Sequence, residues 1–160
     1  MTVPWYRWVL AAPVLLLAAI VGLPVVLLFA TYLGRRGCYP VPCWVWRAGP
    51  TLRRWMDLAP DGRRGGDRFV VQCFGLILVI DVKDTASLIA SERHEVRHAC
   101  QMVRDGCAFP VRYAAGFLRA LRATWPAHPW REALLEAYRS VPYELDAEYA
   151  ESIPYADWRM

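Results

Sequence analysis

Two histidines four residues apart, with a glutamate directly after the first, are the residues of this sequence best suited to chemistry. They form the run His94-Glu95-Val96-Arg97-His98. On a helix, residues four apart lie one turn apart on the same face, so both imidazoles can bind one Zn²⁺. The glutamate between them can accept the proton of a water that the metal activates. The motif therefore predicts a zinc-dependent hydrolase.

A third ligand is needed, because a catalytic zinc usually takes three protein ligands and keeps one position open. A third histidine in the pattern His-Glu-x-x-His-x-x-Gly-x-x-His is excluded, since Gln101 and Arg104 stand where that pattern has glycine and histidine. The alternative is a glutamate from a later helix, where Glu144 and Glu148 are four residues apart. One can bind the metal, and the other can accept a hydrogen bond from the distal nitrogen of a ligand histidine.

His94-Glu95-x-x-His98 followed by Glu144-x-x-Ala-Glu148 resembles the gluzincin pattern of zinc metallopeptidases. It is similar to membrane peptidases of the CAAX-prenyl-protease type, whose downstream motif is Glu-x-x-Ala-Asp, and to small bacterial and phage peptidase domains. The resemblance implies that His94, His98 and Glu144 bind zinc, that Glu95 is the general base, and that Glu148 replaces the family's aspartate. Glu148 departs from the pattern, because glutamate is longer. The resemblance covers only the two motif helices, so the family's substrates do not carry over.

Peptide hydrolysis also needs a hydrogen-bond donor for the negative charge that develops on the carbonyl oxygen. Candidates for this role, or for contact with a peptide or protein substrate, are Tyr143, Tyr138 and Arg97, with Tyr113 and His128 also available. The sequence leaves the choice open. The rival hypothesis is a non-catalytic, anchored structural or interaction protein that retains a metal-binding or degenerate zincin fold.

A helix predicted over residues 85–104 must position the two histidines. Its apolar residues share the side opposite the histidines, which is typical of a helix that packs on a core and presents its polar side to a cleft. Before it, residues 69–82 favour a strand pair bending near Gly75, which could receive an extended peptide at its edge; a re-entrant membrane segment is the alternative. Later helices are expected at 110–123, 130–139 and 142–152. The predicted fold is mainly α with an α+β character: a minimal zincin-like domain with a short strand pair and about four helices.

An uncharged run over residues 8–34 precedes this domain. As a helix it exceeds the roughly 30 Å of the hydrocarbon core, and it is longer than the apolar part of a signal peptide, about 7–15 residues. We therefore predict one transmembrane helix rather than a cleaved leader. One arginine precedes the run and several follow it, which predicts a single-pass membrane protein with its C-terminal domain in the cytoplasm.

The chain of 160 residues is divided into three predicted regions: an anchor at 1–34, a juxtamembrane linker rich in Pro, Arg and Trp at 35–67, and a metallopeptidase domain at 68–160. The basic linker explains the net charge of +4 and would attract anionic lipid, so no nucleic-acid partner is expected. Five cysteines are present, and a cytoplasmic domain would keep them reduced. For Cys38 and Cys43 a metal half-site and a local disulfide are the alternatives.

Overall fold

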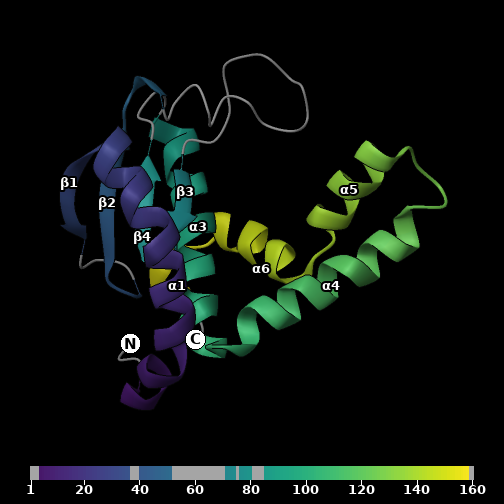
Figure 1. The fold of residues 1–160 in the computed structure, drawn as a ribbon, viewed down its shortest axis with the longest axis horizontal. Coiled ribbons are helices and arrows are strands. Elements are labelled where there is room, and N and C mark those ends of the chain that lie inside the picture. Colours follow the sequence, from purple (N-terminus) through teal and green to yellow (C-terminus); the bar gives the residue numbers. More distant parts are fainter. Residues whose placement is uncertain (1–3, 37–39, 52–70, 75, 81–84, 159–160) are drawn as a thin grey trace.

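The computed structural model of this protein describes residues 4–36, 40–51, 71–74, 76–80 and 85–158. Within these ranges the chain is mainly helical, with a small sheet beside a long N-terminal helix (Figure 1). The elements are, in chain order, α1 Trp5–Phe29, β1 Ala30–Arg36, β2 Cys43–Ala48, β3 Val71–Phe74, β4 Ile77–Ile80, α3 Thr85–Asp105, α4 Ala108–Thr124, α5 Trp130–Arg139, α6 Pro142–Glu151 and the 3₁₀ turn η1 Tyr155–Asp157.

The described strands form one sheet in the order β1-β2-β4-β3. β3 and β4 pair antiparallel, with Phe74 opposite Ile77, and this confirms the predicted strand pair. The bend predicted near Gly75 lies outside the described residues. β2 pairs antiparallel with β1 and parallel with β4. The sheet thus combines strands from all three predicted regions of the chain.

The strands β1 and β2 were not predicted. β1 begins at Ala30, inside the run assigned to the anchor, and β2 lies inside the segment assigned to the linker. β2 has the alternation of a half-buried strand, since Cys43 and Val45 are buried and Trp44 between them is exposed. The prolines that suggested a linker flank this strand and do not interrupt it, which is why their number was misleading.

The helix α3 confirms the expected helix to within one residue, and it buries the expected side. Val96, Ala99, Cys100 and Val103 are buried in one cluster with β2 and with Trp158 near the C-terminus. Burial of apolar surface stabilises a fold by about 25 cal/mol per Å². The burial of this cluster therefore fixes which side of α3 faces the core. The opposite side of α3, which carries the histidines, is thereby directed toward α6.

The helix α1 packs against α3 and against the sheet, and its contact with the end of α3 is close. Gly106 ends α3 with a φ of +56°, and a Cβ there would lie 2.6 Å from the backbone oxygen of Leu10. The backbone N–H of Cys107 donates to the same oxygen at 3.3 Å. In length and composition, α1 qualifies to cross a membrane from Trp5 to Pro24. Unlike a free-standing anchor, it has one face against the domain.

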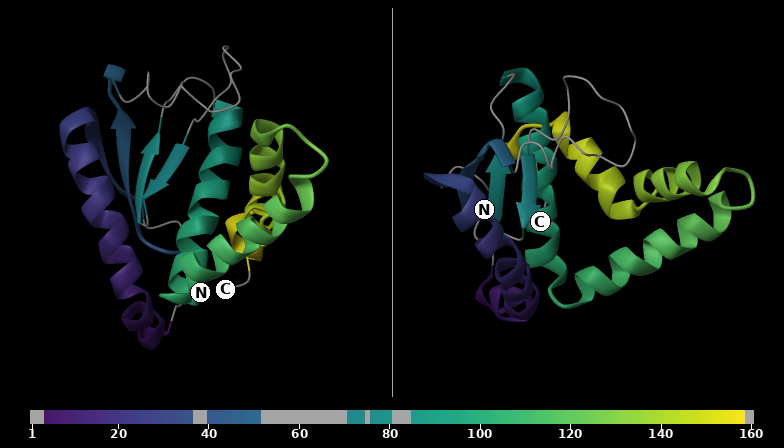
Figure 2. Two further views of the ribbon diagram at one scale, coloured as in Figure 1. Left: turned by 45° about the vertical axis from the view of Figure 1, so that its right-hand side comes forward. Right: turned by 45° about the horizontal axis from the view of Figure 1, so that its top comes forward.

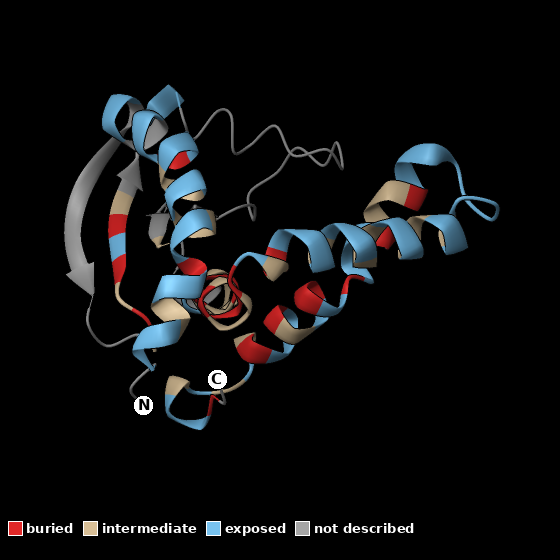
Figure 3. Ribbon diagram, turned by 60° about the horizontal axis from the view of Figure 1, so that its bottom comes forward, coloured by how far each residue is buried: buried red, intermediate tan, exposed pale blue. Residues whose placement is uncertain are grey.

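The helices α4 and α5 form an arm that projects from the lower end of α3, and α6 returns from the arm to the middle of α3 (Figures 1 and 2). The arm is mostly exposed, whereas buried positions concentrate on α3 and α6 (Figure 3). All three helices begin and end within two residues of their predicted limits. The contact between α3 and α6 therefore brings the two parts of the predicted site together.

Candidate metal centre

Three ligand atoms from α3 and α6 converge at one point. Nε2 of His94 lies 3.1 Å from Nε2 of His98 and 3.2 Å from Oε2 of Glu144, and Nε2 of His98 lies 3.4 Å from the same oxygen. His98 and Glu144 are buried, and His94 is nearly so. The structure thus brings together the three predicted metal ligands as a group that could hold a metal ion.

The spacing of these atoms fits a tetrahedral cation. Zn²⁺ binds histidine nitrogen and carboxylate oxygen at about 2.0–2.1 Å, so two ligand atoms of a regular tetrahedron lie about 3.3 Å apart. The three observed separations, 3.1, 3.2 and 3.4 Å, bracket that value. The donor set of two imidazoles and one carboxylate is also one that catalytic zinc sites use. The residues present therefore fit a zinc ion.

The hydrogen bonds behind the imidazoles fix which nitrogens carry protons. Nδ1 of His94 donates to Oε1 of Glu151 at 2.9 Å. Nδ1 of His98 donates to Oε1 of Gln101 at 2.8 Å, and the Gln101 oxygen is the acceptor because its amide nitrogen donates to the backbone oxygen of Tyr143. In the neutral rings, both Nε2 atoms therefore present lone pairs toward the Glu144 carboxylate. Three acceptors facing one another require a cation or an added proton.

The charges around the histidines favour a cation at this point. Burial alone would lower the pKa of His94, but its hydrogen bond to Glu144 and the charges of Glu95, Glu144 and Glu151 outweigh burial and raise the pKa to about 9. The pKa of His98 is also raised, because Glu144 and Glu95 together outweigh its burial. Burial would raise the pKa of Glu144, but its bonds to both histidines hold it far below the usual range.

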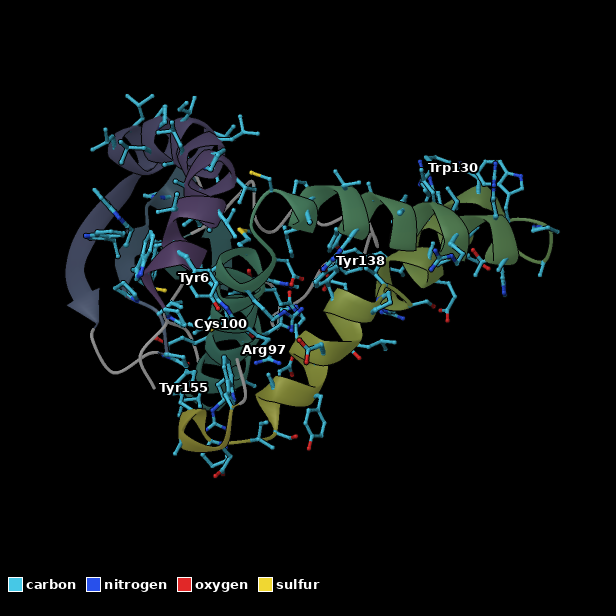
Figure 4. All side chains as sticks on the ribbon, turned by 90° about the horizontal axis from the view of Figure 1, so that it is seen from below. Tyr6, Arg97, Cys100, Trp130, Tyr138 and Tyr155 are labelled. Carbon is cyan, nitrogen blue, oxygen red and sulfur yellow. The ribbon has the colours of Figure 1, made fainter. Side chains whose placement is uncertain are left out.

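Two tyrosines of the arm complete the surroundings of Glu144. The hydroxyl of Tyr113 donates to Oε1 at 2.6 Å, which is the carboxylate oxygen turned away from the histidines. Tyr138 lies close enough to Glu144 for the charge of that carboxylate to act on its hydroxyl, and Figure 4 shows this residue between α4 and α6. Burial and the charge of Glu144 raise the pKa of both tyrosines above its ordinary value. Both hydroxyls therefore stay protonated and act as donors at neutral pH.

Glu95 lies close to this group. It is half-buried, and its negative charge contributes to the raised pKa of His94, His98, Tyr113 and Tyr138. The carboxylate of Glu95 therefore lies within electrostatic range of both imidazoles and of both tyrosine hydroxyls.

The contact behind His94, predicted for Glu148, is made by Glu151. Glu148 is exposed, whereas Oε1 of Glu151 accepts the bond from His94. Glu151 follows Glu144 by seven residues, two turns along the same face of α6, while Glu148 is rotated to one side. The family pattern predicted Glu148, one turn after Glu144. The contact with His94 is instead made by Glu151, two turns after Glu144.

Two of the candidate donors are engaged elsewhere. The hydroxyl of Tyr143 donates to Asp105 at 2.6 Å. Arg97 binds Asp146 through two hydrogen bonds of 2.9 Å and stacks over the ring of Trp158. Figure 4 shows Arg97 between α3 and α6. Of these three candidates, Tyr138 is the one whose hydroxyl is influenced by the charge of Glu144.

From the sequence, no role was predicted for Gln101, which supports His98, or for Asp146. Gln101 follows His98 by three residues, so it shares the face of the histidine, and that spacing was available as a signal. Asp146 accepts from Arg97 and Gln101, so it links α6 to α3. His128, the remaining histidine, lies at the outer turn of the arm, 3.9 Å from Glu132.

No family model, no curated protein and no solved structure matches this chain. The assignment of the site therefore depends on its own geometry.

Proposed function

We propose that this protein is a zinc-dependent peptidase held at a membrane by α1, with His94, His98 and Glu144 as metal ligands and Glu95 as general base. One observation carries the proposal. Three lone-pair atoms on buried or nearly buried side chains converge at the edge lengths of a tetrahedral zinc site, with tautomers fixed by Glu151 and Gln101. Buried acceptors are rarely left facing one another without a bridging cation or proton.

The reaction follows from the placement of the side chains. When bound, zinc polarises the scissile carbonyl and makes a nearby water more acidic. Glu95 accepts a proton from that water as its oxygen bonds to the carbonyl carbon, and delivers the proton to the amide nitrogen as the C–N bond breaks. The products are a carboxylate and an ammonium group, because the second proton of the water passes from the new carboxylic acid to the released amine. Tyr138 is the proposed donor to the carbonyl oxygen, since burial and the charge of Glu144 raise the pKa of its hydroxyl and keep it protonated.

An extended peptide is the proposed substrate. In the described sheet, β3 lies at one edge and packs beside α3, the helix that carries the histidines. A peptide that adds to this edge would run past the metal ligands with its backbone hydrogen-bonded to β3. The cytoplasmic location of the domain stays a prediction, which a reporter fused to the C-terminus can test.

A second candidate is a non-catalytic protein in which the same group is a structural ionic cluster. It is favoured by the raised pKa of His94, about 9, because a protonated His94 can donate to Glu144 without any metal. The two candidates differ in metal content and in the effect of removing the Glu95 carboxylate.

The test uses the full chain purified in mild detergent, with zinc quantified by elemental analysis and hydrolysis followed on a peptide library. We expect one zinc per chain in the wild type and in Glu95→Gln, with hydrolysis lost only in the variant. Glu136→Gln on α5, an exposed glutamate, is the matched control and should keep both properties. If the wild-type chain binds no zinc when zinc is supplied, the peptidase proposal is wrong and the structural ionic cluster is favoured.

A further inference from the structure

The helix α4 carries an exposed apolar line that nothing in the described chain covers. Val111, Leu118 and Trp125 follow one another at intervals of seven residues, the last directly after the helix, so they lie along one side. Their exposed fractions are 68%, 57% and 53%. The other side of α4, with Phe109, packs against α6 and α5. Single apolar residues on a surface need no explanation, but an aligned group of them is typical of a surface that contacts a partner or a membrane.

The charge on α4 has one sign. The helix carries three arginines, Arg112, Arg119 and Arg122, and no acidic residue. All three are exposed. Arg122 lies beside the apolar line, one turn after Leu118, whereas Arg112 and Arg119 lie nearer to α6, and Arg112 is 3.6 Å from Asp105. A helix with an apolar line ending in tryptophan and flanked by arginines is the pattern of a helix that lies in the interface of an anionic bilayer.

The helix α1 presents its own exposed apolar side next to α4. The two helices meet where Cys107 bonds the backbone of Leu10, one residue before α4 begins. Both helices lie along the upper margin in Figure 4, and α4 and the N-terminal turns of α1 lie at the lower margin in the right panel of Figure 2. The large apolar residues exposed on α1 are Trp5, Tyr6, Val9, Leu10, Leu16, Leu17, Ile20, Val21, Leu23, Leu27 and Leu28.

The contact between α1 and α3 limits how α1 can meet a membrane. A bilayer that surrounded α1 on all sides, with Leu10 in the hydrocarbon, would also surround the end of α3 with Arg104 and Asp105. Charged groups at that depth are costly. A bilayer lying against the exposed side of α1 leaves the end of α3 in water and reaches α4 at the same time.

From this arrangement we infer that α1 and α4 form one membrane-contact surface that lies on an anionic bilayer. The line Val111, Leu118 and Trp125 enters the interface, and Arg119 and Arg122 meet lipid phosphates, while Arg112 stays paired with Asp105. Trp130, exposed at the start of α5, lies at the outer end of the arm, where an amphipathic ring favours the headgroup level (Figure 4). In this orientation α6 lies behind α4, so the metal centre faces solution close to the membrane. The inference does not depend on zinc or on catalysis.

The experiment places the full chain in nanodiscs of phosphatidylcholine and phosphatidylglycerol that contain a diazirine photolabel in the acyl chain. Labelled residues are then mapped by mass spectrometry. We expect labels on α1 and on all three residues of the α4 line. Leu145 and Tyr149 of α6 are internal controls, because they are apolar and exposed to a similar extent, 52% and 66%, and should stay unlabelled. Labels on α1 alone would overturn the inference and favour a conventional span.

A charge placed in the line tests the contact directly. Leu118→Asp should reduce labelling of α4 at least fivefold while labelling of α1 persists, and nanodiscs without phosphatidylglycerol should reduce it to a smaller extent. Leu145→Asp is the matched control and should leave the labelling pattern unchanged. If instead the wild type forms dimers in detergent that Leu118→Asp separates, with α4 unlabelled in nanodiscs, the line is a contact between copies of the chain and the inference is wrong. Zinc content, measured on the same samples, reports independently on the metal site.

Discussion

Two polar clusters join α3 to α6, and they differ in how their donors and acceptors match. In the first, Arg97 gives two N–H groups to the two oxygens of Asp146, and the Gln101 amide gives one of its own to the same carboxylate. Every contact there pairs a donor with an acceptor. In the second, the Nε2 atoms of two histidines and an oxygen of Glu144 face one another as acceptors.

This difference separates a structural contact from a binding site on one pair of helices. The Arg97–Asp146 cluster is complete as it stands, so it holds α6 at a fixed distance from α3. The triad of His94, His98 and Glu144 is complete only with a cation or a proton among its atoms. The Arg97–Asp146 cluster keeps these three acceptors close together by holding α6 against α3. The two are linked by Gln101, whose oxygen accepts from His98 while its nitrogen donates to Asp146. The comparison predicts that changes to the two clusters have different consequences.

The largest effect is expected from Glu144→Gln, which removes the charge of the triad and keeps its size. Structural zinc sites bind with about 10–16 kcal/mol from four ligands, so one ligand contributes about 2.5–4 kcal/mol. Zinc affinity should therefore fall by roughly 100- to 1,000-fold. Competition with a chromophoric chelator measures the loss in the full chain. Glu148→Gln is the control on the same helix, and equal losses in both variants would show that Glu144 has no special role.

The second prediction concerns pH in the zinc-free chain. The folded pKa of His94, about 9, lies above its unfolded value of about 6.5, so protonated His94 stabilises the fold fully below pH 6.5. This contribution, up to about 3 kcal/mol, is lost as pH rises from 6.5 through 9. Denaturant unfolding in detergent across this range measures it. Zinc competes with the proton, so its apparent affinity should rise over the same interval. Stability of the zinc-free chain that is flat from pH 6.5 to 9 would contradict the coupling of His94 to Glu144.

The sequence predicted the parts of this structure that depend on local pattern. The face of α3 with Val96 and Val103 was predictable, because apolar spacing fixes which side of a helix is buried. The His94, His98 and Glu144 group was predictable because each helix carries its own motif. The contacts made by Glu151 and Asp146 were not, since they depend on how α6 is offset along α3, and no single helix encodes that offset.

The same distinction explains the outcome at the N-terminus. The helix α1 follows from composition alone, but β1 and β2 do not, because a strand such as Cys43–Ala48 becomes recognisable only through the partner it pairs with. The prolines and tryptophans of that segment predicted a linker, because the strand that pairs with it, β4, lies far away in the sequence. The contact between α1 and the end of α3 at Gly106 could not be predicted either, because it joins residues that are far apart in the sequence.

A smaller effect is expected when the complete cluster is broken. Asp146→Ala leaves the Arg97 guanidinium, whose side chain is only 12% exposed, without its two strongest bonds. The carboxylate of Asp146 is partly solvated, so the expected loss in free energy of unfolding is about 2 kcal/mol. Thermal unfolding of the zinc-free chain, followed by circular dichroism, measures it. Asp157→Ala, at an exposed position, should leave the midpoint unchanged. A loss confined to the zinc-loaded chain would show that this cluster belongs to the metal site instead.

The smallest and most discriminating effect is expected from Glu151→Gln. The carboxylate of Glu151 accepts the bond from Nδ1 of His94 at 2.9 Å, which orients the ring and makes its Nε2 a better ligand. A glutamine oxygen can still accept that bond but lacks the charge, so zinc affinity should fall by about tenfold, the lower limit for residues behind a ligand. Glu148→Gln changes the same chemical group three residues earlier on α6 and should leave affinity unchanged. Both variants remove one negative charge from α6. A difference in their zinc affinity therefore measures the contact between Glu151 and His94 separately from the effect of net charge. Equal small losses would mean that net charge alone acts on the metal, and a larger loss in Glu148→Gln would restore the family pattern.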